Sequence, residues 1–79
     1  MNDTDIARVQ AYLRATLGND RIHIDGPKRK GGTAEVRIGD EFIGTVHRDD
    51  DDGEVSFSLM ISILDEDLPS VALPRARDR

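Results

Sequence analysis

The feature that most constrains this fold is a change of hydrophobic period after Gly18. Between residues 4 and 17, apolar side chains recur three or four positions apart, at Ile6, Val9, Leu13 and Leu17. That spacing lines one face of an α-helix. From residue 21 onward, apolar and polar residues alternate, as they do in half-buried strands. The chain therefore predicts one amphipathic helix followed by a sheet.

Residues that favour helix capping lie at both ends of the predicted helix. Asp3 or Thr4 can cap its amino end by accepting hydrogen bonds from backbone N–H groups, and Gly18 can adopt the left-handed conformation that ends a helix. The polar residues of the helix, Arg8, Gln10 and Arg14, are expected to face water.

Four segments alternate like strands, namely residues 21–25, 33–38, 41–47 and 54–64. The connections between them are short, and Gly39 with Asp40 fits a two-residue hairpin turn. Short connections favour antiparallel neighbours, so we expect an α+β fold in which the helix covers one face of a four-stranded antiparallel meander. Val36 and Phe57 should be central in the core, and Phe42, Gly44 and Val46 should share the inward face of the third strand.

The domain is expected to span residues 3–68. The segment 69–79 contains two prolines and three arginines with few apolar residues, so we expect a disordered tail.

Composition narrows the function. The formal net charge of −5 disfavours nucleic acid and anionic membranes as general partners. No cysteine is present, no apolar run is long enough to span a bilayer, and the first residues lack the pattern of a secretory signal. We therefore expect a cytoplasmic protein without a membrane partner.

The four consecutive aspartates 49–52, followed by Gly53, suggest a possible calcium-binding loop. Aligning Gly53 with the invariant glycine of an EF-hand loop puts Arg48 at the first ligand position and Leu59 at the twelfth, so both end ligands are lost. Aspartate and glycine are also common turn residues. We therefore predict a solvated turn and no metal ligands.

Catalytic signals are weak. His23 and His47 should lie on the polar face with a strand between them, about 10 Å apart, which is too far for one metal ion. Ser56 or Ser58 could lie beside His47, but the chain has no nucleophile elbow and an open sheet offers no oxyanion hole. We expect no enzyme, no catalytic residues and no cofactor.

Two surfaces are candidates for binding. Lys28, Arg29 and Lys30 form a basic, glycine-flanked loop that could contact a phosphate, although it lacks the spacing of a phosphate-binding loop. The second surface is the outer side of the fourth strand. Met60, Ser62 and Leu64 alternate there within the unusually apolar stretch of residues 59–64. A strand that is apolar on both faces and lies at an edge invites a second copy of itself, unless a bulge or the tail covers it.

The segments "GDEFIG", "HRDDDDGEVSF" and "ILDEDL", together with the short opening helix, resemble a family of small uncharacterised proteobacterial proteins classed as a domain of unknown function. The resemblance covers residues 3–68. It implies one compact helix-plus-sheet domain and brings no catalytic or ligand residues.

We therefore expect a small non-enzymatic interaction module that homodimerises through its last strand, with an unidentified protein partner. The alternative is a weak nucleic-acid or phosphate binder that uses the basic loop 28–30.

Overall fold

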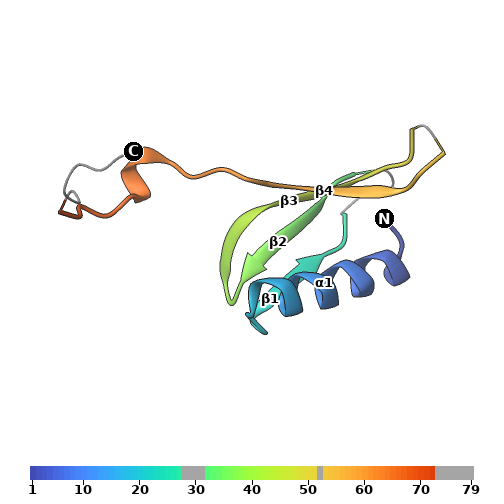
Figure 1. Cartoon of the computed structure of the whole chain (residues 1–79), viewed down its shortest axis with the longest axis horizontal. Helices are drawn as coiled ribbons and strands as arrows, with labels where there is room; N and C mark the ends of the chain where they lie inside the picture. Colours follow the sequence, from blue (N-terminus) through green and yellow to red (C-terminus); the bar gives the residue numbers. More distant parts are fainter. Residues whose placement is uncertain (28–31, 52, 73–79) are drawn as a thin grey trace.

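The computed structural model describes residues 1–27, 32–51 and 53–72. It contains one α-helix, a four-stranded antiparallel sheet in the order β1-β2-β3-β4, and a short 3-10 helix (Figure 1). The elements are α1 (Asp3–Leu17), β1 (Ile22–Asp25), β2 (Ala34–Ile38), β3 (Glu41–Asp49), β4 (Ser56–Ile61) and η1 (Asp65–Asp67). The predicted α+β class, the meander order and the helix on one face are confirmed.

The two ends of α1 are closed by its own residues. The cap at the amino end is Asn2 and not Asp3 or Thr4, because its side chain accepts a hydrogen bond of 2.7 Å from the backbone N–H of Asp5. Asp5 accepts in return from the backbone N–H of Asn2, which completes a capping box. At the other end Gly18 has φ 64°, and its left-handed conformation ends the helix as predicted.

The face of the sheet that α1 covers is here called the inner face, and it holds the buried core. Side chains from α1 and the first three strands form this core: Leu13, Ile22, Ile24, Ala34, Val36 and Val46. Val36 is central, as predicted. The prediction that Phe57 of β4 is equally central is wrong: Phe57 is only partly buried and packs against this cluster, because α1 contacts the sheet mainly at β1.

A β-bulge in β3, where this strand pairs with β2, changes which of its side chains face the core. Val36 lies opposite Gly44, but the next residue, Arg37, lies opposite Phe42, so Ile43 is the extra residue. Phe42 therefore leaves the inner face and is 58% exposed, whereas Ile43 packs against the core. The prediction that Phe42 points inward is wrong, because alternation cannot continue through an inserted residue.

Polar side chains of α1 close the outer edge of β1. The Nε of Arg14 donates a hydrogen bond of 2.8 Å to the carbonyl oxygen of Ile22, and the backbone N–H of Ile24 donates one of 2.9 Å to Oε1 of Gln10. Gln10 and Arg14 were expected to face water, so this expectation is wrong. Their role is to satisfy backbone groups that an edge strand would otherwise expose.

At the opposite edge, β4 is shorter than predicted. The expected strand of eleven residues is observed as six. Its pairing with β3 begins where Ser56 lies opposite Asp49 and ends where Ile61 lies opposite Gly44. On the Glu41 side of Gly44, the bulge turns β3 away from β4, while the chain after β4 continues almost straight (Figure 1). The radius of gyration is 15.8 Å, whereas a compact chain of this length would have about 12 Å. The segment 62–72 is thus an arm that extends away from the sheet.

Candidate binding surfaces around the last strand

The outer face is the side of the sheet opposite α1, and it carries both histidines. His23 on β1 pairs across the strands with Arg37, and His47 on β3 pairs with Ser58. Strand β2 separates the two histidines, as predicted. Nδ1 of His23 lies 3.3 Å from Nη2 of Arg14, so its ring takes part in the closed β1 edge.

Acidic residues of the β3–β4 turn are tied to their own chain. Oδ2 of Asp50 accepts a hydrogen bond of 2.8 Å from Arg48, and Oδ1 of Asp49 accepts one of 3.0 Å from the backbone N–H of Asp51. Gly53 has φ 80°, a conformation that suits a turn. Within residues 1–27, 32–51 and 53–72, no three His, Cys, Asp or Glu side chains are placed to hold a metal ion. Asp52 lies outside the described residues.

The predicted anion contacts Lys28, Arg29 and Lys30 also lie outside the described residues. Among the described residues of the outer face, Phe42 has an exposed ring and pairs across the strands with Arg37. Sequence reasoning missed this aromatic position. The available signal was Gly44, since a glycine inside a strand often marks a bulge.

The predicted dimer contacts do come together in space. Met60, Ser62 and Leu64 line one hollow of about 270 Å³ with Phe42, and these four residues are here called the outer patch. Met60 is 68% exposed, and Leu64 and Phe42 are exposed as well. The hollow exists because the bulge turns Phe42 outward toward the end of β4. The outer patch is therefore an apolar surface at the edge of the sheet.

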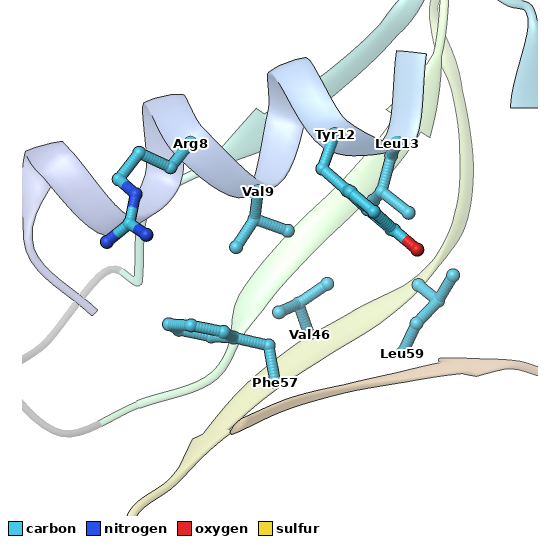
Figure 2. Close-up of a pocket in the computed structure, with 7 residues that line it drawn as sticks. All are labelled: Arg8, Val9, Tyr12, Leu13, Val46, Phe57 and Leu59. Carbon is cyan, nitrogen blue, oxygen red and sulfur yellow. The ribbon is translucent and has the colours of Figure 1, made fainter. Parts of the chain in front are cut away.

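A second apolar hollow lies on the inner face, between α1 and β4, and is here called the α1–β4 groove. Figure 2 shows Val9 and Leu13 of the helix facing Val46 and Phe57 of the sheet, with Leu59 and Tyr12 farther along. Arg8 lies at the other end of the groove, which has a volume of about 430 Å³. Sequence reasoning missed this hollow, because it depends on α1 lying toward β1 and leaving β4 exposed.

Arg48 forms ion pairs with one residue of α1 and one of the acidic turn. Oδ2 of Asp5 lies 3.5 Å from Nε of Arg48, and the same guanidinium bonds Asp50. This bridge connects the start of α1 to the end of β3. The groove itself is lined mainly by apolar atoms, which favours an apolar occupant.

The fold and these surfaces define a small α+β domain, with one helix and an antiparallel meander, whose candidate sites are apolar and lie along the last strand. The chain belongs to the family DUF3126, described as a protein of unknown function, whose model matches residues 5–67. Searches of curated proteins and of solved structures found no match. No helix in the described part of the chain is long and apolar enough to cross a membrane.

Proposed function

We propose that this chain is a small non-enzymatic interaction module that forms a homodimer through β4. The observation that carries the proposal is the contrast between the two edges of the sheet. Side chains of α1 close the edge at β1. The end of β4, by contrast, carries exposed apolar side chains on both faces, with Leu59 and Ile61 on the inner face and Met60 on the outer face.

A second copy suits this edge better than a loop or a small ligand. Within the part of the chain that the structure describes, β4 has a strand partner on one side only. Two such edges can pair antiparallel about a two-fold axis, which satisfies their backbone groups without propagating into a fibre. The pairing also brings two outer patches together. We propose a cytoplasmic setting for this dimer, since a chain without cysteine needs no oxidising compartment to fold.

Met60→Lys tests the proposal. Met60 lies outside the buried core, so a lysine there should leave the circular dichroism unchanged while placing a charge in each half of the interface. Sedimentation should show a dimer for the native chain and a monomer for the variant. Thr33→Lys is the matched control, since it makes the same charge change at an exposed position before β2. A native chain that is monomeric at high micromolar concentration would contradict the proposal.

One observation favours the alternative, a nucleic-acid or phosphate binder. Sheet-type RNA binders stack bases on exposed aromatic rings, and Phe42 is exposed beside Arg37. The net charge of −5 opposes it. Salt-sensitive binding of single-stranded RNA that is lost in Phe42→Ala and in the triple alanine variant of Lys28, Arg29 and Lys30 would favour this second function.

A further inference from the structure

The α1–β4 groove exists because one helix cannot cover the whole inner face. Four strands spaced about 4.8 Å apart form a sheet nearly 20 Å wide, whereas a helix with its side chains is about 10 Å across. Since α1 lies toward β1, the uncovered part lies over β3 and β4. Val46, Phe57 and Leu59 form its floor, and Tyr12, 65% exposed, lies at its rim. The uncovered surface is apolar, so it needs an apolar occupant.

The arm after β4 carries a side chain of the right kind on the right face. Alternation places Phe57, Leu59 and Ile61 on the inner side of β4, and an extended continuation puts Ile63 on the same side. Ile63 is 70% exposed in its own chain. It lies beyond the end of the sheet and contributes nothing to its own core.

Ile63 cannot reach the groove of its own chain while the arm stays extended. It follows Phe57 by six positions in the chain, which is about 20 Å along a strand. Figure 1 shows the same relation, because the arm leads away from α1 and from the β3–β4 turn. A second copy removes the problem, since antiparallel pairing brings the arm of one chain alongside the first half of β4 in the other.

We infer that Ile63 of a second copy fills the α1–β4 groove. The inference rests on the proposed dimer and names what each chain donates to the other. Residues that face each other across an antiparallel pair lie on the same face, so inner-face residues of one β4 lie opposite inner-face residues of the other. With the two-fold axis at Met60, Ile63 lies opposite the partner's Phe57, which forms the groove floor. The contact occurs twice in the dimer.

Tyr12 reports on the groove without any label, because it is the single tyrosine and the chain has no tryptophan. Its fluorescence can be quenched by acrylamide while sedimentation measures the dimer fraction in the same samples. We expect the quenching constant to fall severalfold as protein concentration drives dimerisation, because the arm of the second copy shields the ring.

Variants of Ile63 test whether its side chain makes the groove contact. Ile63→Asp should restore quenching of Tyr12 and lower the dimer fraction, whereas Ile63→Val should behave like the native chain. Ala11→Asp is the matched control, because it adds the same charge on an exposed side of α1 that does not line the groove.

Each remaining outcome overturns a distinct claim. A dimer whose Tyr12 stays open to quencher would overturn the groove contact and leave the β4 dimer intact. A monomer with Tyr12 open would overturn both. A monomer with Tyr12 shielded would show that the chain's own residues fill the groove, and that the second copy is not the occupant.

Discussion

At the residue scale, position in a strand predicts which face a side chain takes but not how deeply it is buried. Val36 and Phe57 both have the inward parity, as alternation predicts. Val36 is buried and Phe57 is only partly buried, because α1 contacts the sheet mainly at β1 and leaves β4 less covered. Depth depends on where the helix sits, and the helix position follows from contacts that no local pattern encodes.

The first prediction therefore ranks two core substitutions. Ile22→Ala removes a fully buried side chain and should lower the free energy of unfolding by about 2–5 kcal/mol. Phe57→Ala should cost about 2 kcal/mol, less than the value for a fully buried phenylalanine, because much of the ring faces the groove. Urea unfolding at a concentration where the chain is monomeric measures both. A larger cost for Phe57→Ala would place the centre of the core over β4.

At the element scale, the sheet is asymmetric in how its edges are protected. Gln10 and Arg14 look like ordinary solvent-facing helix residues in the sequence, yet both bond the backbone of β1. This role could not be predicted, because it requires the helix to lie beside the strand and not squarely over the sheet. Strand length was similarly unpredictable, since β4 ends where β3 bends away and not where its own alternation ends.

A second prediction tests the closed edge at β1. Gln10→Leu keeps the size of the side chain but removes the oxygen that accepts from the N–H of Ile24. Leaving that group without its partner should cost about 1–3 kcal/mol. Hydrogen exchange followed by NMR should show faster exchange at the Ile24 amide in the variant. Gln10→Glu is the control, because a carboxylate oxygen can still accept. Equal protection of Ile24 in Gln10→Leu would show that this bond does not hold the edge.

A third prediction concerns the pairing of β3 with β4. A Cβ at Gly44 would collide with the backbone carbonyl of Met60, and a backbone atom can move away only if the strands separate. Gly44→Ala should therefore weaken or break the pairing around Gly44 and Ile61 and lower the melting temperature. Thr45→Ala, at the next position on the outer face, should have a small effect. An unchanged melting temperature for Gly44→Ala would mean that the two strands are farther apart.

At the scale of the whole molecule, charge opposes the association that the apolar surfaces favour. Residues 49–67 contain eight acidic side chains and no basic one. In the proposed dimer, the arm of one chain runs beside the β3–β4 turn of the other, so η1 and its three acids lie near the partner's acidic turn. With the two-fold axis at Met60, Glu54 lies opposite the partner's Glu66. The proposed dimer is thus one in which apolar contact opposes like-charge repulsion.

The fourth prediction follows from that balance. Salt screens repulsion between exposed charges, since the Debye length falls from about 30 Å at 0.01 M to about 8 Å at 0.15 M. The dimer of the native chain should therefore be tighter at 0.15 M than at 0.01 M salt, measured by sedimentation. Glu66→Lys should strengthen the dimer at low salt, because the lysine would face the partner's acidic turn. Asp20→Lys makes the same charge change at an exposed position between α1 and β1 and should strengthen it less. A dimer that weakens with added salt would mean that attraction between opposite charges holds the two chains, and would place the interface away from β4.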